Sequence, residues 1–337
     1  MKKRLISTVL SVVIMLSMIF VLVACNTNFS GSGTATDLTS QTSINIASLK
    51  GPTSIGLVKL YSDSDNNRTS NKYNYNIYGT ADEISAGLIK GDIDIAAIPC
   101  NLASILYNKT EGGVLIAGIN TLGVLYIVEK GCDINSISDL KGMTIYSTGQ
   151  GTTPEYTLRY ILSENGINPD TDVTINYCQE ASEVVSAISA KESAVAMLPQ
   201  PYVTVAMNSV EGLSVALDVT EEWEKLDSDS TVVTGVVVIR KDFADNNPEA
   251  VNSFLREYAK STGFANNNID ECAGLLEQFD IFKAAIAQKA IPECNVTLIT
   301  GEAMYNKVLS YLKVLYDANP ASVGNTMPDE NIFYTTD

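Results

Sequence analysis

The pattern of hydrophobic and polar positions repeats itself after one hundred residues. Residues 80–106 and 180–206 align without gaps, with four identities and matching apolar positions along their length. In each copy, apolar residues recur at helical spacing and then form a short apolar run that Pro99 or Pro199 ends. A helix followed by a buried strand is typical of a βαβ unit. The repeat therefore predicts two lobes of the same α/β type.

A second pair of similar segments lies upstream of the two copies. Residues 44–47 and 144–146 favour a β-strand, and each run leads through a polar loop, 48–54 or 147–153, into the start of a helix. In open α/β sheets, ligands bind at the carboxyl ends of the parallel strands. We therefore expect the two loops to face a common ligand site between the lobes.

Two β-favouring runs predict where the chain crosses between the lobes. Residues 114–129 favour a strand that is interrupted at 120–123, and this interruption predicts the crossing to the second lobe. Residues 231–240 are mostly β-branched and predict the return to the first lobe. Lobe 1 is expected to comprise 43–122 and 236–337, and lobe 2 residues 123–235. We expect further helices over 53–61, 102–107, 201–208, 248–264, 269–279 and 300–317, strands at 75–78, 173–177 and 213–218, a loop at 63–72, and an exposed turn or short helix at 221–225. The C-terminal helices should pack on lobe 1.

The first 25 residues carry the pattern of a lipoprotein signal. Three basic residues, Lys2 to Arg4, precede an almost wholly apolar run that ends at Ala24. Such a run could also span a membrane, but Leu22-Val-Ala-Cys25 resembles a bacterial lipobox, in which Cys25 is lipidated and becomes the new N-terminus. Residues 26–42 are polar and predict a flexible tether. We expect an extracytoplasmic protein held to the cell membrane by lipid.

Charge and composition narrow the class of partner and of chemistry. After Cys25 the chain carries 19 basic and 39 acidic residues, a net charge of −20, which argues against nucleic acid or anionic lipid as a partner. The five cysteines after Cys25 show no CxxC spacing, so we expect no metal site. Single buried thiols are expected, and Cys272 with Cys294 is the one pairing to test. The absence of histidine removes the commonest general base.

Several of these motifs together resemble a known family. They are the DLKG of Asp139 to Gly142 with the polar loop that follows, Asn165 to Pro169, Ala187 to Leu198, and Pro199-Gln-Pro-Tyr202. This set is similar to the substrate-binding proteins of bacterial ABC importers, within the group that binds nitrate, sulfonates, taurine and thiamine-precursor pyrimidines. The resemblance covers about residues 44–260.

The resemblance implies a two-lobed type II periplasmic-binding fold and a monomer without cofactor. Its members capture a small solute by closing the lobes and deliver it to permease subunits served by a separate ATPase. An enzyme on the same fold, such as one that makes the thiamine-precursor pyrimidine with iron and histidines, is the alternative, as is a sensor module. We expect no catalytic residue and no metal ligand.

The candidate ligand contacts follow the strand ends. From lobe 2 we expect the start of a helix to offer backbone N–H groups to an anionic or accepting group. In lobe 1, Lys50 is the one cation of either loop and suits a sulfonate or carboxylate, although it could be merely exposed. Thr152 or Thr153 could instead only cap the helix, and Tyr202 could stack on a ligand or join the core. Trp223 is expected to pack near the surface. The predicted contacts are Ser48, Lys50, Pro52, Thr53, Ser54, Asn101, Asn120, Ser147, Thr148, Gly149, Gln150, Thr152, Thr153, Gln200 and Tyr202.

Overall fold

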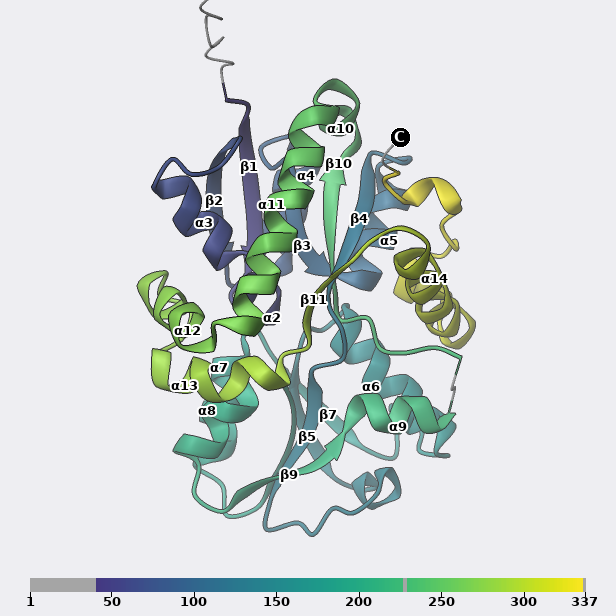
Figure 1. Ribbon diagram of the computed structural model, residues 1–337. Helices are drawn as coiled ribbons and strands as arrows, with labels where there is room; N and C mark the ends of the chain where they lie inside the picture. The colour runs from purple at the N-terminus through teal and green to yellow at the C-terminus, as the bar shows by residue number, and fades with distance from the viewer. Residues whose placement is uncertain (1–40, 227–228, 336–337) are drawn as a thin grey trace, which may run out of the picture. The chain divides into compact units, whose positions relative to one another are not determined.

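The computed structural model describes residues 41–226 and 229–335, which form two β-sheets flanked by helices (Figure 1). The predicted signal, Cys25 and nearly all of the tether lie outside the described residues. Within the described ranges, no helix is both long enough and apolar enough to cross a membrane.

The first sheet has six strands in the order β11-β4-β10-β3-β1-β2. Strand β1 pairs in parallel with β2 and β3, whereas β10 runs antiparallel to both β3 and β4. All residues of β3 and β4 are buried, as their unbroken apolar runs predict. The strands are β1 Ser43–Leu49, β2 Lys72–Tyr78, β3 Ile95–Pro99, β4 Val114–Thr121, β10 Gly235–Arg240 and β11 Val296–Ile299.

The second sheet has five strands in the order β7-β6-β8-β5-β9. Strand β6 is parallel to β7 and β8, and β5 is antiparallel to β8 and β9. The chain passes from the first sheet to the second between Thr121 and Leu125, and it re-enters the first sheet at Gly235. The strands are β5 Leu125–Lys130, β6 Thr144–Thr148, β7 Thr174–Cys178, β8 Ala194–Pro199 and β9 Leu213–Asp218. The lobe boundaries themselves stay a prediction.

The two repeat units form matching helices, α4 Ala81–Lys90 and α7 Ala181–Ser189. Helix α4 ends at Gly91, whose φ of 83° is the left-handed conformation that glycine adopts at low cost. The Thr80 hydroxyl donates to the Glu83 carboxylate (3.3 Å) and does not cap the backbone of α4. In the second copy, Glu183 accepts hydrogen bonds from the backbone N–H groups of residues 179 and 180, at 2.8 and 3.4 Å.

The other helices follow the predicted order, with three differences. The expected helix over 53–61 is broken at Gly56, where an added Cβ would lie 3.1 Å from Thr262 Oγ1 and 3.3 Å from Tyr258, so the chain packs closely there. Helices α10 and α13 and strand β11 were not predicted. The helices are α2 Pro52–Ile55, α3 Val58–Asp65, α5 Cys100–Lys109, α6 Thr153–Glu164, α8 Tyr202–Ser209, α9 Val219–Leu226, α10 Lys241–Asn246, α11 Pro248–Asn267, α12 Ile269–Gln278, α13 Ala284–Ala290 and α14 Gly301–Ala318.

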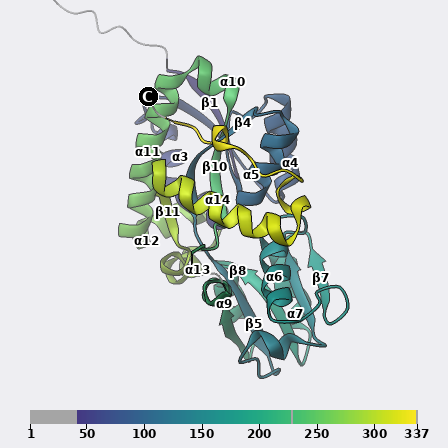
Figure 2. The ribbon, with the colours of Figure 1, turned by 90° about the vertical axis from the view of Figure 1, so that its right-hand side faces the viewer.

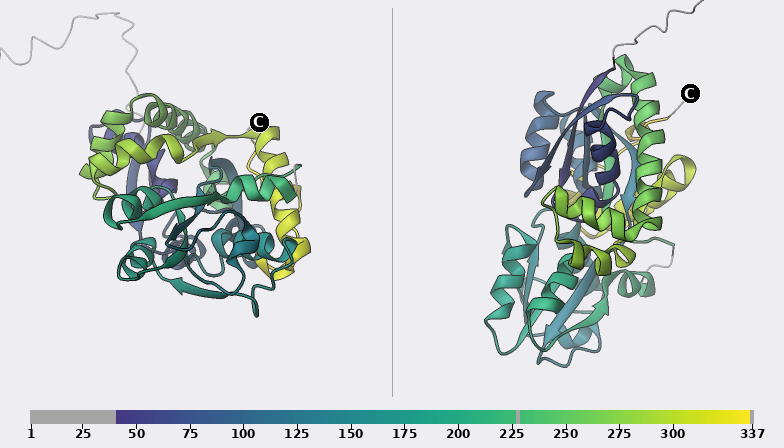
Figure 3. Two further views of the ribbon diagram at one scale, coloured as in Figure 1. Left: turned by 90° about the horizontal axis from the view of Figure 1, so that it is seen from below. Right: turned by 60° about the vertical axis from the view of Figure 1, so that its left-hand side comes forward.

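The C-terminal helices contact lobe 1, as expected, through α3, β4 and β11, and they also contact lobe 2. The segment after α12 places Phe282 against the ring of Tyr202 in α8, with 5.2 Å between the centroids. On α14, the Tyr311 hydroxyl lies 2.8 Å from that of Thr157 in α6. Figures 2 and 3 show α12, α13 and α14 along the boundary between the two sheets. These helices therefore brace the lobes against each other.

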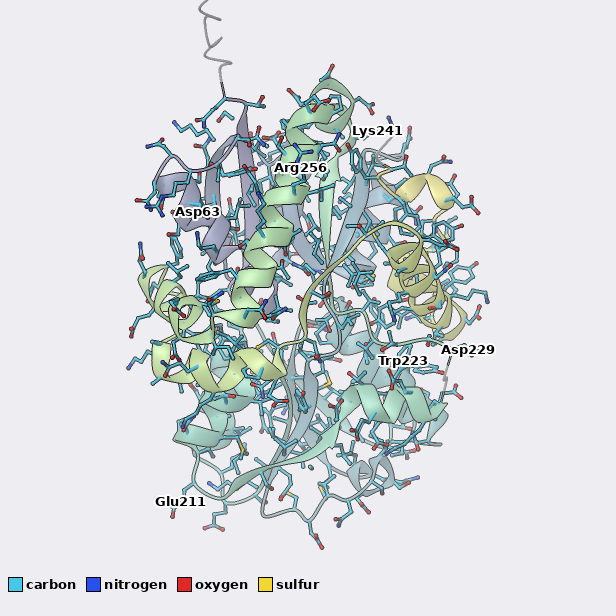
Figure 4. All side chains as sticks on the ribbon, viewed as in Figure 1. Asp63, Glu211, Trp223, Asp229, Lys241 and Arg256 are labelled. Carbon is cyan, nitrogen blue, oxygen red and sulfur yellow. The ribbon has the colours of Figure 1, made fainter. Side chains whose placement is uncertain are left out.

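Trp223 belongs to the core and not to the surface. It lies on α9 (Figure 4), is fully buried, and donates from its indole N–H to Ser230 Oγ at 2.8 Å. Its ring also packs against Tyr160 and Tyr311. The acidic residues beside it in the sequence occupy the opposite, exposed side of the helix because neighbours in a helix point in different directions.

Candidate functional site

A cavity of about 470 Å³ lies between the two sheets, at the carboxyl ends of their parallel strands. Its volume is in the range of about 300–1,000 Å³ that small-molecule sites occupy. Both lobes contribute to its walls. The lining residues are Leu49–Thr53, Gly79–Asp82, Pro99, Leu125, Thr148–Thr152, Pro154, Tyr177–Ala181, Pro199, Tyr202 and Thr234.

The hundred-residue repeat is visible in these walls. The loop after β1 lines one side with residues 49–53, and the loop after β6 lines the other with residues 148–152. The loops after β2 and β7 contribute 79–82 and 177–181 in the same way, and Pro99 is matched by Pro199. Equivalent loops of the two units therefore form the cavity, as the placement of ligand sites at strand ends predicts.

Eight of the predicted contact residues line the cavity. They come from the loop after β1, the loop after β6 and the start of α8. Tyr202 is buried, and burial, followed by the charge of Glu180, raises its pKa to about 12. That these residues touch a ligand stays a prediction. They are Lys50, Pro52, Thr53, Thr148, Gly149, Gln150, Thr152 and Tyr202.

Three of the predicted serines lie behind the lining. The Ser54 hydroxyl is 2.7 Å from Ser48 Oγ and 2.6 Å from the carbonyl of residue 49, so it ties the loop to the start of α2. Ser48 also lies 3.2 Å from the hydroxyl of Tyr61. Ser147 is part of strand β6 and not of the loop, is buried, and donates to the Thr148 carbonyl. All three are hydrogen-bonded within the protein.

The other four predicted residues that lie outside the lining also bind protein groups. Asn101 receives a hydrogen bond from Thr153 Oγ1 at 3.3 Å. Asn120 donates from Nδ2 to the carbonyl of Thr53 at 3.2 Å. Gln200 Oε1 accepts from the backbone N–H and the hydroxyl of residue 204, at 3.3 and 2.9 Å, within the first turn of α8. Their positions support the cavity from behind.

The sequence-based set missed the loops after β2 and β7. Thr80, Asp82, Gln179 and Glu180 line the cavity from these loops. The position of these residues directly after parallel strands could have indicated that they line the site. Their spacing before an apolar helical pattern indicates only the start of a helix. Leu125, Tyr177, Cys178 and Thr234 are further lining residues that no motif indicated.

Two threonine hydroxyls that have no hydrogen-bond partner in the described part of the chain lie behind the buried side of the cavity, enclosed by protein atoms. Thr53 and Thr234 are 5% and 8% exposed, and neither hydroxyl has a hydrogen-bond partner among the described residues. Asn120 Oδ1, just behind them, is also unpartnered. A Cβ added to Gly235 would lie 2.6 Å from that oxygen and 2.8 Å from Thr53 Cγ2, so only glycine fits there. Buried polar groups usually have partners, but these oxygens are closed off from the cavity, so a ligand reaches them only if the walls move.

Three backbone N–H groups near the starts of α6 and α7 already donate to acceptors within the chain. The N–H of Gly151 donates to Glu155 Oε2 at 2.6 Å, and that of Thr152 donates to the Gly149 carbonyl at 3.0 Å. In the other loop of this lobe, the N–H of Gln179 donates to Glu183 at 2.8 Å. These three N–H groups of the expected cradle therefore already have acceptors within the chain, and ligand contact by the other N–H groups stays a prediction.

No described residues offer a metal site or a disulfide. Within the described ranges, no group of three or more histidine, cysteine, aspartate or glutamate side chains could hold a metal ion. The five described cysteines are all free, including Cys272 and Cys294. The cavity walls are therefore suited to non-covalent recognition by hydroxyl, amide, carboxylate and apolar groups.

A family model matches residues 66–290 of the chain, and it describes the periplasmic phosphonate substrate-binding proteins of ABC transporters. The chain belongs to this family. It is thus a substrate-binding component of an ABC importer, and the resemblance that the sequence motifs indicated is confirmed. No curated protein matches the chain.

Solved structures of family type share the fold. An ABC transporter protein from Parabacteroides distasonis has a TM-score of 0.72 at 24% identity, covering 88% of this chain and 100% of that one. The aliphatic sulphonate binding protein SsuA of Escherichia coli has a TM-score of 0.70 at 15% identity, with 88% and 94% covered. The nitrate-binding protein NrtA of Synechocystis has 0.58 at 14% identity, with 76% and 69% covered. The expected two-lobed periplasmic-binding fold is confirmed.

Proposed function

We propose that this family member captures a small organic solute in the cavity between its lobes, closes on it, and delivers it to permease subunits that a separate ATPase drives. The observation that carries the proposal is the cavity itself, which loops of both lobes line in matching pairs. A ligand that touches both walls binds the closed arrangement better than an open one, and it therefore shifts the population toward closure.

The cavity has the size and lining of a site for an organic molecule. Its walls include four prolines, two tyrosines and Leu125, with threonine hydroxyls on the buried side. Nitrate, sulfonates, taurine-like compounds and pyrimidines were the expected solutes. A cavity of about 470 Å³ with apolar walls favours the larger, organic members of that set.

We also propose that lipid on Cys25 holds the protein at the outer face of the cell membrane and that it works as a monomer. The apolar run before Cys25 and the polar residues 26–42 support this placement, because a tethered binder stays near its permease. Replacement of Cys25 by serine should release the protein from the membrane fraction.

The test is to identify what the protein carries. The protein is purified from the cells that produce it naturally and is then unfolded with denaturant. Mass spectrometry of the small molecules that this step releases identifies the candidate ligands. Each candidate is then added back at about 100 times its dissociation constant, which should stabilise the fold by about 2.7 kcal/mol. Ala81→Trp fills the cavity and should abolish the shift, whereas Ala86→Trp, on the exposed face of the same helix, should not. Equal shifts in both variants would refute the proposed site.

A further inference from the structure

The charged side chains of the cavity are mostly acidic. Asp82 and Glu180 line it from equivalent loops of the two lobes, and Lys50 is the one basic residue in the described lining. Lys50 lies 3.9 Å from Asp280, a fully exposed carboxylate outside the lining. Among the described residues, neither Asp82 nor Glu180 forms an ion pair. Both carboxylates are exposed at the edge of the cavity and lack a cationic partner within the described ranges, and Glu180 accepts a hydrogen bond from the Ser182 hydroxyl at 3.3 Å.

Glu180 reaches from lobe 2 to the wall of lobe 1. Its Oε1 lies 2.7 Å from the point where a Cβ on Gly79 would sit, and Gly79 follows strand β2 of the first sheet. The carboxylate thus lies where the two lobes meet across the cavity. A ligand between the lobes must lie close to this negative charge.

Two of the backbone N–H groups that could bind an oxyanion donate to acidic side chains of the chain. At the start of α6 the Glu155 carboxylate accepts a hydrogen bond from the N–H of Gly151, and at the start of α7 the Glu183 carboxylate accepts one from the N–H of Gln179. Helix starts attract anions through such N–H groups. Here a sulfonate or phosphonate would meet carboxylates in place of free donors, and like charges at short range repel.

The remaining lining suits the body of an organic cation. Tyr177 and Tyr202 supply aromatic rings, which attract cations through their faces. Leu125 and the four prolines supply apolar contact. The hydroxyls of Thr53 and Thr234 lie behind this lining, enclosed by protein atoms and without a partner among the described residues.

We propose that the cavity takes an organic cation, an ammonium compound with an apolar body, in preference to an oxyanion. The ammonium group lies between Asp82 and Glu180, and the body lies against the tyrosine and proline walls. This inference rests on the proposed function. It assigns a substrate class opposite in charge to sulfonate, phosphonate and nitrate, because the acidic lining is a property of this chain.

The test compares probes that share one apolar body. Benzylammonium, benzyl alcohol, phenylmethanesulfonate and phenylmethylphosphonate, together with choline and tetraethylammonium, are each titrated into the whole mature protein by thermal shift and calorimetry. Asp82→Asn with Glu180→Gln is the test variant. Asp92→Asn with Glu192→Gln is the matched control. Both residues are exposed and lie outside the lining, and their replacement changes the net charge of the protein by the same amount as the test variant does.

We expect the cations to bind and the oxyanions not to bind. The test variant should weaken cation binding by about tenfold or more, because a charge-assisted contact contributes about 1.5–3 kcal/mol, and the control should leave binding unchanged. Tighter binding of the sulfonate or phosphonate overturns the inference and leaves the proposed function standing. Equal loss in both variants also overturns it, since the effect would then be one of net charge. If no probe binds and the denatured protein releases no small molecule, both proposals fail.

Discussion

Asn101 at the start of α5 joins the two lobes through its side-chain amide. Its Oδ1 accepts from the hydroxyl of Thr153 in α6 at 3.3 Å, and its Nδ2 lies 3.4 Å from the carbonyl of Gly151. The same Nδ2 donates to the carbonyl of Ser322 at 2.9 Å. The residue is fully buried behind the cavity. One side chain thus connects the first sheet, the second sheet and the C-terminal segment.

Removal of this connection should weaken ligand binding. Asn101→Ala deletes two contacts to lobe 2, each worth about 0.5–1.5 kcal/mol, so we expect the dissociation constant to rise about tenfold. Calorimetry with the solute that the protein carries measures the change. Asn108→Ala is the control, because Asn108 donates to Val323 and Thr326 of the same C-terminal segment without touching lobe 2. An equal loss of ligand affinity in Asn108→Ala would show that affinity depends on the contacts to the C-terminal segment and not on the contacts of Asn101 with lobe 2.

Two glycine-to-alanine changes should have opposite effects on stability. Gly235→Ala places a Cβ 2.6 Å from Asn120 Oδ1 in a buried site, and we expect a loss of about 1–3 kcal/mol from overpacking. Gly263→Ala adds a methyl group in open space within α11, and we expect a gain of about 0.8–1 kcal/mol from helix propensity. Urea unfolding at pH 7 measures both. A neutral Gly235→Ala would contradict the close packing behind the cavity.

The cysteines should divide into two classes of reactivity. Burial raises the pKa of the Cys272 thiol to about 12 and also raises the pKa values of Cys100 and Cys294. Thiolate is the reactive form, so at pH 8 these three should resist Ellman's reagent in the native protein, while Cys132 and Cys178 are partly exposed. With Cys25 replaced by serine, we expect at most two fast thiols in the native state and five in guanidinium. Three thiols in guanidinium without reductant, in place of five, would reveal a disulfide within the chain.

Glu129 should make stability depend on pH at the acidic end. The backbone N–H of Cys132 (2.8 Å) and then the hydroxyl of Ser214 (2.7 Å) hold its pKa below the usual range. A lowered folded-state pKa means that the stabilisation is present above the unfolded-state pKa of about 4.3 and is lost as pH falls through the folded value. Glu129→Gln should therefore cost about 0.5 kcal/mol at pH 7, a small effect because water screens this carboxylate.

The difference from wild type should vanish at pH values below the folded-state pKa of Glu129, where both proteins carry a neutral side chain at position 129. Urea unfolding at a series of pH values measures it. Glu211→Gln is the control, since Glu211 lies on an exposed loop (Figure 4) and forms no hydrogen bond through its side chain within the described residues. A difference that stays constant from pH 7 to below that pKa would assign the effect to packing and not to charge.

Most strands could be predicted because their apolar runs are buried on both faces, as in β3 and β4. The break at Gly56 has a local signal, because glycine is unfavourable inside a helix, but the close approach of Tyr258 and Thr262, some two hundred residues away in the sequence, does not. Strand β11 is a short run whose residues favour a strand, but its pairing with β4 is visible only in the structure. Long-range contacts of this kind leave no local pattern.

The candidate site was predictable in its location but not in its charge. Strand ends placed Lys50 and Gln150 on facing walls, and both line the cavity. Asp82 and Glu180 lie at helix starts, where acidic residues commonly stabilise the helix dipole, so their sequence context suggested a structural role. Whether a carboxylate at such a position faces solvent or a cavity depends on the opposite lobe, and the sequence of one lobe does not contain that information.

Two nearly equivalent walls raise the question of how a ligand is oriented. If the repeats were identical, the cavity would have twofold symmetry, and a ligand would fit equally well in two opposite directions. Divergence at matched positions, Lys50 against Gln150 and Asp82 against Ser182, removes that symmetry. The matched loops therefore enclose the cavity, and the differences between them give it polarity, so that the two ends of a bound molecule would meet different groups.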